Sequence, residues 1–249
     1  MSIVTYEKDG AVGIVTLAKP PHSLIDNALL EELLAAYSSA VNEGCRSILL
    51  RSNVRHFCAG ADVNGFTNGG RRRDQKGFEE FIGALENVPL PTIAAVHGAA
   101  LGGGFELALT CDMILAADTA TFGMAEASLG LIPLLGGVQR VVQGAGPARA
   151  KEMAIFGRRH DPAALERWGI INLVVPEAEL ATAALSWARQ LAAGPTVALG
   201  AIKMLANLSA RHGLAGADAR QTEMNNQMWA SKDRVAKVVE IGVGDHLLS

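Results

Sequence analysis

The sequence is poor in cysteine and in net charge. Its 249 residues include three cysteines, Cys45, Cys58 and Cys111. They are odd in number and widely spaced, so they predict neither a disulfide framework nor a zinc pair, and a reducing compartment is expected. The formal net charge of -3 gives no general attraction to nucleic acid or to anionic membranes. No apolar run reaches the ~18 residues of a membrane span, and no signal peptide is evident. We therefore expect a cytoplasmic protein with neither a nucleic-acid nor a membrane partner.

Motifs for metal, hydrolytic and nucleotide chemistry are also missing. The six histidines show no H-x₃-H or clustered spacing, which argues against a metal site. Ser128 and Asp112 lack the context of a nucleophile elbow, so a hydrolytic triad is not supported. The glycine-rich segment Gly102–Glu106 is followed by no Lys-Ser/Thr pair, and its G-x-G-x-x-G spacing fails at Leu107. It is therefore not a nucleotide-binding loop.

What is present is an apolar, alternating chain. Hydrophobic residues make up 49% of it, enough for a sizeable core. Asp9-Gly10 predicts a hairpin turn, and Asp26 or Asn27 can cap a helix that runs to about Glu43. Strands alternate with helices up to residue 175, which predicts the α/β class. The expected strands are Ile3–Tyr6, Val12–Leu17, Ser47–Arg51, Thr92–Val96, Met113–Ala116 and Leu173–Val175, with further helices at Phe78–Glu86 and from about Gly103.

From Glu177 onward the pattern is almost wholly helical. We therefore divide the chain into an α/β core, residues 1–193, and a helical C-terminal region, residues 194–249. The helices after Glu177 carry more apolar residues than packing on their own core requires, which predicts a partner surface. Gly65–Lys76 is the best candidate for a mobile loop. The apolar residues are Leu180, Leu185, Trp187, Leu191, Leu199, Ile202, Met204, Leu205, Met224, Met228 and Trp229.

Three segments carry candidate chemistry, and each has a simpler explanation when taken alone. Phe57–Asp62 follows a strand, and Gly60 permits a turn close to another group, although an ordinary turn is the commoner explanation. Gly102–Glu106 opens a helix, where free backbone N–H groups face whatever lies ahead. Its glutamate could equally support the helix dipole. Thr121–Pro133 places Glu126 in an apolar stretch, where a carboxylate is costly unless it has a use. A loop-exposed glutamate remains the commoner explanation.

In order and content, these segments together resemble the crotonase family of enoyl-CoA hydratases and isomerases. Arg55–Val63 is similar to the family's first oxyanion segment, Ala95–Asp112 to its second and Phe122–Arg140 to its third. The resemblance spans residues 3–235, and three motifs in this order are not expected by chance. It implies an α/β crotonase-like spiral of ββα turns, with a helical C-terminal region that builds a homotrimer or a dimer of trimers.

The resemblance also implies residue roles. By matching motif positions, the N–H groups of Ala59 and Gly103 form an oxyanion hole for a coenzyme A thioester, and Glu106 and Glu126 form the acid–base pair. Coenzyme A is part of the substrate, so neither a separate cofactor nor a metal is implied. Such a hole stabilises an enolate, and two carboxyl groups at opposite protonation states can move the protons that hydration needs. The residues expected to line the substrate site are Cys58, Ala61, Asp62, Val63 and Leu134.

The sequence departs from the family pattern in three places. Ile132–Gly137 reads Ile-Pro-Leu-Leu-Gly-Gly where hydratases usually have Ile-Pro-Gly-Ala-Gly-Gly. Leu134 and Leu135 therefore stand near the expected water, and we expect their side chains to turn outward, because two glutamates are more than a simple isomerase requires. Pro20–Leu24 and the tail at Asp233–Gly244 also differ, so coenzyme contacts there are not assumed.

These features rank the possible functions. Hydration of 2-enoyl-CoA is the first choice, and isomerisation of 3-enoyl-CoA to 2-enoyl-CoA is the close alternative, because isomerisation tolerates a drier pocket. Another crotonase-type reaction, such as dehydration or carbon–carbon cleavage, remains open. A non-catalytic binding subunit is a further alternative from a different class. The retention of both glutamates and both oxyanion segments argues against it.

Overall fold

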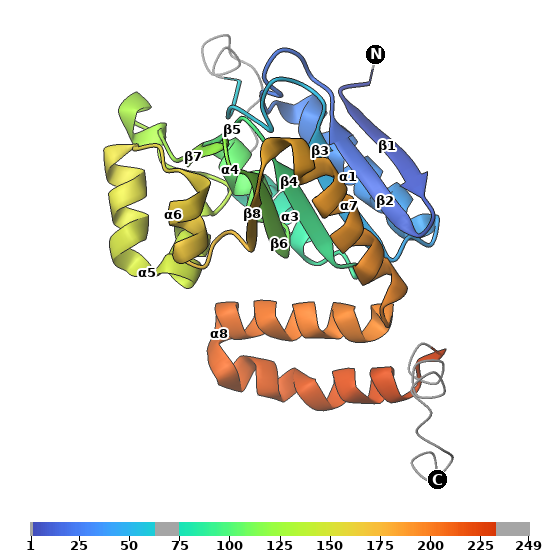
Figure 1. Ribbon diagram of the computed structural model, residues 1–249. Helices are drawn as coiled ribbons and strands as arrows, with labels where there is room; N and C mark the ends of the chain where they lie inside the picture. Colours follow the sequence, from blue (N-terminus) through green and yellow to red (C-terminus); the bar gives the residue numbers. More distant parts are fainter. Residues whose placement is uncertain (1, 63–74, 233–249) are drawn as a thin grey trace.

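The computed structural model describes residues 2–62 and 75–232. Its centre is a six-stranded sheet in the order β1-β2-β3-β4-β6-β8 (Figure 1). The β1–β2 pair is antiparallel and the other pairs are parallel. This arrangement confirms the α/β class predicted from the alternating pattern. The strands are β1 (Val4–Asp9), β2 (Val12–Leu17), β3 (Ser47–Ser52), β4 (Thr92–Val96), β6 (Met113–Ala117) and β8 (Leu173–Val175).

Local sequence explains how the sheet begins. Asp9 pairs with Val12 across the predicted hairpin turn, and Gly10 has a φ of 60°, a conformation that glycine adopts without steric cost. Every residue of β2 and of β4 is buried. Such continuous burial is typical of strands that are covered on both faces of a largely parallel sheet.

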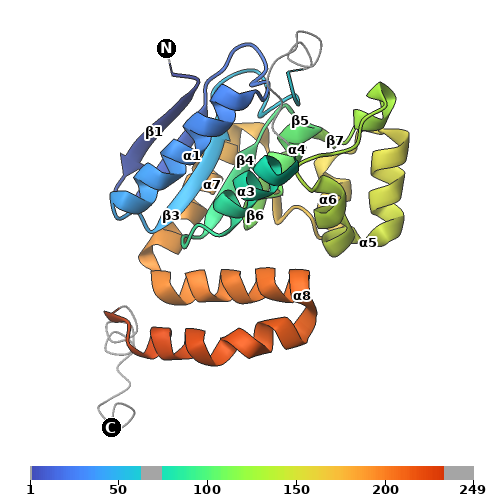
Figure 2. The same cartoon turned by 180° about the vertical axis from the view of Figure 1, so that it is seen from behind.

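Helices supply that cover on both faces (Figures 1 and 2). α7 (Glu177–Ala193) lies on one face, against β3, β4 and β6. α1 (Asn27–Asn42) and α3 (Gln75–Glu86) lie on the other. α1 begins where the sequence predicts, because the Asp26 carboxylate accepts a hydrogen bond of 2.9 Å from the Leu29 N–H.

A smaller two-stranded sheet beside the central one carries the segments of interest. β5 (Ala99–Leu101) pairs in parallel with β7 (Thr121–Gly123). β5 runs into the short helix α4 (Gly103–Ala108), and β7 is followed by a single 3₁₀ turn, η1 (Glu126–Leu129). Two motifs that are far apart in sequence therefore begin side by side. The remaining elements on this side of the molecule are α5 (Gly137–Phe156) and α6 (Pro162–Arg167) (Figure 1).

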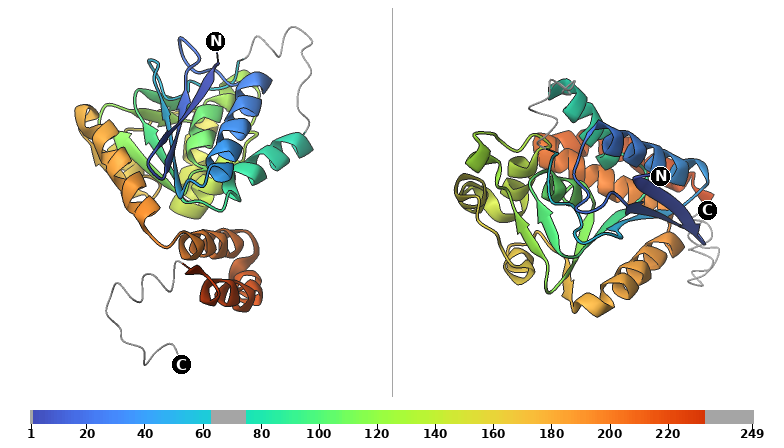
Figure 3. Two further views of the ribbon diagram at one scale, coloured as in Figure 1. Left: turned by 90° about the vertical axis from the view of Figure 1, so that its right-hand side faces the viewer. Right: turned by 90° about the horizontal axis from the view of Figure 1, so that it is seen from above.

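The last described element is α8 (Thr196–Trp229), which folds into two arms below the core (Figures 1 and 3). The break lies at Gly213, whose φ of 71° and ψ of -179° are not helical. The sequence pattern favours two helices here, Thr196–Ser209 and Leu214 to about Trp229, and in the structure the two arms meet at Gly213. The division of the chain at residues 193 and 194 into separate regions stays a prediction.

The sequence also leads to expectations about membrane spans and about a mobile loop. Within residues 2–62 and 75–232, no single helix is long and apolar enough to span a membrane, and α7 and α8 together pass that test only as a pair bent by 108°. Most of the predicted mobile loop, Gly65–Lys76, lies outside the described residues, as does the tail after Lys232.

Candidate active site

The first oxyanion segment, around Cys58–Ala61, makes one backbone bridge to β5 and another to Ile25. Cys58 bridges to Ala100 of β5, and Ala61 bridges to Ile25. In the second bridge, the Ile25 N–H donates to the Gly60 carbonyl at 2.9 Å, and the Asp62 N–H donates to the Ile25 carbonyl at 2.8 Å. A parallel bridge of this kind uses the groups on either side of its central residue. The N–H of Ala61 therefore points away from Ile25.

The predicted oxyanion role of Ala59 is not met by its geometry. Its N–H donates to the carbonyl of His22 at 3.0 Å, so it is already paired. The N–H of Ala61, two residues later, has no acceptor among the residues that the structure describes. Motif position alone does not show which N–H of this segment already has an acceptor. We therefore replace Ala59 by Ala61 as the candidate donor.

Gly103 meets the other half of the expectation. It is the first residue of α4, where the helix provides no intrahelical acceptor for its N–H. Within the described part of the chain, this N–H also has no other acceptor. A Cβ added to Gly103 would stand 4.0 Å from the Ala61 nitrogen and 3.0 Å from Cδ1 of Ile25. Gly103 and the N–H group of Ala61 therefore lie near each other, beside the aliphatic side chain of Ile25.

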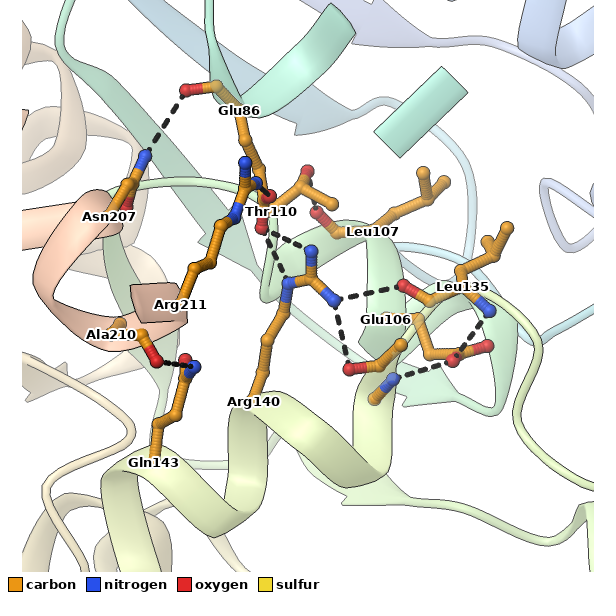
Figure 4. Close-up of polar contacts among 12 residues, drawn as sticks. Glu86, Glu106, Leu107, Thr110, Leu135, Arg140, Gln143, Asn207, Ala210 and Arg211 are labelled. Atoms are coloured by element: carbon orange, nitrogen blue, oxygen red, sulfur yellow. Dashed lines mark hydrogen bonds and ion pairs between the residues drawn. The ribbon is translucent and has the colours of Figure 1, made fainter. Parts of the chain in front are cut away.

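Glu106 lies one turn further along α4 and is 2% exposed. Its Oε1 accepts two hydrogen bonds, from the N–H of Leu135 at 2.9 Å and from the N–H of Gly137 at 2.8 Å (Figure 4). The carboxyl group is thereby fixed at the start of α5. These bonds occupy Oε1 alone and leave Oε2 for other partners.

Glu126 is the first residue of η1. Its Oε2 is buried and has no hydrogen-bond partner among the described residues. Its Oε1 would stand 2.7 Å from a Cβ added to Gly102, the residue just before the Gly103 donor. A buried carboxyl oxygen without a partner is unusual in a folded protein and commonly marks a functional site. The structure therefore brings Glu126 next to the candidate oxyanion donors.

Both carboxyl groups hold protons more tightly than free glutamate does. The pKa of Glu106 is raised from 4.5 to about 7, chiefly by burial. The charge of Glu126 acts in the same direction, whereas the N–H groups of Gly137 and Leu135 and the charge of Arg140 oppose the rise. Burial also raises the pKa of Glu126. The influence of Glu126 on Glu106 indicates that the two groups share one site. Groups that titrate close to neutral pH are suited to giving and taking protons.

The raised pKa of Glu106 has a consequence for stability. Because the folded state holds this proton more tightly than the unfolded chain, the stabilising contribution is complete below about pH 4.5 and is lost as the pH rises through about 7. We expect Glu106→Gln, which can keep both N–H bonds, to raise the melting temperature at about pH 8 by removing a penalty on the order of 3 kcal/mol at most. Thermal unfolding at about pH 5 should show little difference. Equal melting temperatures of parent and variant at both pH values would contradict a raised pKa of Glu106 in the folded state.

The two leucines that depart from the family pattern take different positions. Leu135 is 5% exposed, and its Cδ1 would lie 3.8 Å from a Cβ on Gly103, so its side chain points inward. The expectation that both leucines turn outward is therefore wrong for Leu135, because its side chain packs in the hydrophobic core, where its apolar surface is removed from water. Leu134 is half-buried, and its N–H has no acceptor within the described residues.

The other predicted substrate-lining residues are placed as follows. Cys58 is fully buried and its thiol donates to the Ser23 carbonyl at 3.0 Å, so its side chain is not available to a substrate. Ala61 is exposed and Asp62 is half-buried beside it. Val63 lies outside the described residues. No group of three or more His, Cys, Asp or Glu residues in the described chain could hold a metal ion.

Sequence reasoning missed one residue of this site. Arg140 of α5 donates to the carbonyls of Leu135 and Gly136, in the turn that holds Glu106 (Figure 4). In the sequence, Arg140 is only the last residue of the third motif. Its position shortly after the pair Gly136-Gly137 was the available signal, since glycine permits a bulky group to approach the backbone closely.

A family model, related sequences and solved structures all point to one protein family. Residues 7–241 match the enoyl-CoA hydratase/isomerase family. The chain is 33% identical over 240 residues to a probable enoyl-CoA hydratase of Rhizobium meliloti, covering 92% of this chain and 90% of that one. It is 36% identical over 198 residues to a carnitinyl-CoA dehydratase of Proteus mirabilis, covering 78% and 76%. A solved enoyl-CoA hydratase from Bacillus anthracis superposes with a TM-score of 0.86 at 27% identity, covering 96% of each chain.

Proposed function

The chain belongs to the enoyl-CoA hydratase/isomerase family, and we propose that it hydrates 2-enoyl-CoA thioesters to 3-hydroxyacyl-CoA. One observation carries the proposal. The buried carboxyl group of Glu106 and the half-buried one of Glu126, both with raised pKa values, lie near the N–H groups of Ala61 and Gly103, which have no acceptor among the described residues. This combination supplies both the electrostatic and the proton-transfer parts of the reaction. No other cofactor is needed, since coenzyme A belongs to the substrate.

In this proposal the thioester oxygen accepts hydrogen bonds from the N–H groups of Ala61 and Gly103. Drawing electrons toward that oxygen makes the β-carbon electrophilic and stabilises the enolate that forms when water adds. The aliphatic side chains of Ile25 and Leu135 lie beside Gly103. Backbone donors stabilise charge more strongly beside apolar groups than in bulk water.

The two glutamates would divide the proton transfers. One ionised carboxylate takes a proton from water as the oxygen attacks the β-carbon, and the other carboxyl group, protonated, delivers a proton to the α-carbon. Neighbouring carboxyl groups favour this split, because the charge of one raises the pKa of the other. In this proposal the N–H of Leu134, which has no acceptor among the described residues, holds the water.

Isomerisation of 3-enoyl-CoA is the second candidate, and the buried side chain of Leu135 favours it. Each buried methylene adds about 0.8 kcal/mol in favour of an apolar acyl chain, at the expense of water. The experiment follows crotonyl-CoA hydration and 3-enoyl-CoA isomerisation in the parent, in Leu135→Ala and in Leu134→Gly. Our proposal expects hydration to be the faster reaction of the parent. A parent that isomerises well and hydrates only after either substitution would establish the second candidate.

We further propose that the chain forms a homotrimer or a dimer of trimers. The apolar stripe of α7 is used by the core, with Leu180 only 5% exposed. α8 instead leaves large apolar side chains in solvent, which is unusual for a lone subunit. Light scattering of dilute protein should therefore give a multiple of the 26.1 kDa chain mass, and a monomer mass would contradict this. A cytoplasmic location stays a prediction. The exposed apolar side chains of α8 are Val197, Ile202, Met204, Leu214 and Trp229.

A further inference from the structure

The turn Leu135–Gly137 binds Glu106 through its N–H groups and a second side chain through its carbonyl groups. Its inner N–H groups, on Leu135 and Gly137, bind Oε1 of Glu106. Its carbonyls, on Leu135 and Gly136, accept from Nη1 of Arg140 at 3.2 and 2.9 Å (Figure 4). One guanidinium nitrogen therefore fixes the peptide units whose N–H groups place the catalytic carboxyl group.

Gly136 makes this close approach possible. A Cβ at this position would stand 2.1 Å from Nη1 of Arg140, well inside any allowed contact. The residue also has a φ of 84°, which disfavours any other amino acid. The turn and the arginine thus fit each other, and the glycine serves the arginine contact as well as the turn.

Arg140 is in turn oriented by Glu86, the last residue of α3. Its Nε donates to Oε1 of Glu86 at 2.6 Å, and Nη2 forms an ion pair with the same oxygen. The side chains are 17% and 12% exposed, respectively, so water screens the pair only in part. The planar guanidinium can serve the carboxylate and the two carbonyls at once, a geometry that lysine cannot reproduce.

The C-terminal helix α8 joins the same carboxylate. Arg211 forms an ion pair with Oε2 of Glu86, the oxygen that Arg140 leaves free (Figure 4). Nearby, the Asn207 side chain donates to the Glu86 carbonyl at 3.4 Å, and Gln143 of α5 donates to the Ala210 carbonyl at 3.2 Å. The first arm of α8 is therefore docked onto α3 and α5 where they support the Glu106 turn.

We propose that Arg140 is a positioning residue for Glu106, and that Arg211 of α8 supports it through their shared partner, Glu86. The chain of contacts is continuous, running from Arg211 to Glu86, to Arg140, to the Leu135–Gly137 turn and to Glu106. Docking of α8 thereby contributes to the placement of the catalytic carboxyl group. This inference rests on the proposed acyl-CoA function, in which Glu106 moves protons.

If Arg140 were purely structural, its replacement would lower the melting temperature and leave the pH dependence of the remaining activity unchanged. A positioning role also acts on the titration of Glu106, because the positive charge of Arg140 lowers the pKa of that carboxyl group. We take Glu106 as the carboxylate that accepts the proton from water, because the two N–H groups that it binds favour its ionised form. Its titration then sets the acidic limb of the kcat/KM profile, which separates the two roles.

The experiment measures kcat, KM and this pH profile with crotonyl-CoA in the parent, Arg140→Met, Arg140→Lys and Arg211→Met. Arg140→Met should lower kcat by about 10², the cost of a carboxyl group displaced by about 1 Å, and should move the acidic limb to higher pH. Arg140→Lys keeps the positive charge and loses the planar guanidinium that binds Glu86 and the two carbonyls. Its kcat should therefore fall, while the acidic limb of its kcat/KM profile stays near that of the parent. Arg211→Met should lower kcat about two- to fivefold, the size of a partly exposed ion pair.

Matched controls come from the same helices. Arg149 of α5 pairs with Glu152, and Arg220 of α8 pairs with Glu223, in both cases at the surface. Arg149→Met and Arg220→Met should leave kcat and the pH profile unchanged. If Arg140→Met fails to fold, Arg140→Lys and Arg211→Met still decide the matter.

The outcomes separate this inference from the proposed function. An active parent whose Arg140→Lys and Arg211→Met variants keep the parent kcat overturns the inference alone. An unmoved pH profile in folded Arg140→Met does the same. A parent that converts no enoyl-CoA overturns the proposed function, and with it the basis of the inference.

Discussion

Gly103→Pro is expected to lower kcat/KM for crotonyl-CoA by about 10²–10³, the usual cost of one oxyanion donor. Proline has no N–H, so the substitution deletes one of the two donors proposed to hold the thioester oxygen. Gly103 is the first residue of α4, and proline is well tolerated at the first position of a helix. The fold should therefore survive, which circular dichroism and thermal unfolding will check.

Gly103→Ala is the matched control for this loss. It adds the same Cβ, which would stand 3.0 Å from the flexible end of Ile25, and keeps the N–H. We expect it to retain most of the activity that Gly103→Pro loses. Equal losses in the two variants would assign the effect to crowding and would remove the main support for an oxyanion role of Gly103.

Glu126→Gln is expected to lower kcat by at least ~10², the lower end for a positioned acid–base group. The substitution keeps the shape of the side chain and removes its ability to exchange a proton. The melting temperature should not fall, because the buried Oε2 of Glu126 has no partner to lose among the described residues. Steady-state kinetics at saturating crotonyl-CoA measure the change.

Glu152→Gln provides the comparison on the surface. Glu152 pairs with Arg149 and Arg158 away from the site, so its replacement should leave kcat at the parent value. An almost unchanged kcat in Glu126→Gln as well would mean that Glu126 is structural. The proposed acid–base pair would then lack one member.

The fold was predictable largely because its elements obey simple local rules. The cap at Asp26 and the turn at Gly10 depend on near neighbours in sequence, and both are found in the structure. β5 and β7 have three residues each, too few for an alternating pattern to show. α5 contains Gly146 and Pro147, which ordinarily end a helix, so sequence alone gave no expectation there.

The site shows where sequence reasoning stops. The resemblance located the first oxyanion segment and named Ala59 as its donor, yet among the described residues it is the N–H of Ala61 that has no acceptor. A motif fixes the order of residues and not the direction in which each N–H points. That direction depends on the bridge to Ile25, a residue 36 positions earlier than Ala61. The same holds for Leu135, whose burial in the core is a tertiary contact that the motif does not specify.

The most direct test of the central claim is the conversion of crotonyl-CoA by the parent protein in D₂O, followed by mass spectrometry and NMR of the product. The account predicts 3-hydroxybutyryl-CoA that carries one carbon-bound deuterium, at the α-carbon, since a glutamate that exchanges with solvent delivers that proton. Formation should be slowed by at least ~10² in Glu126→Gln. Recovery of unchanged crotonyl-CoA from the parent, with no hydration and no deuterium at carbon, would contradict the account.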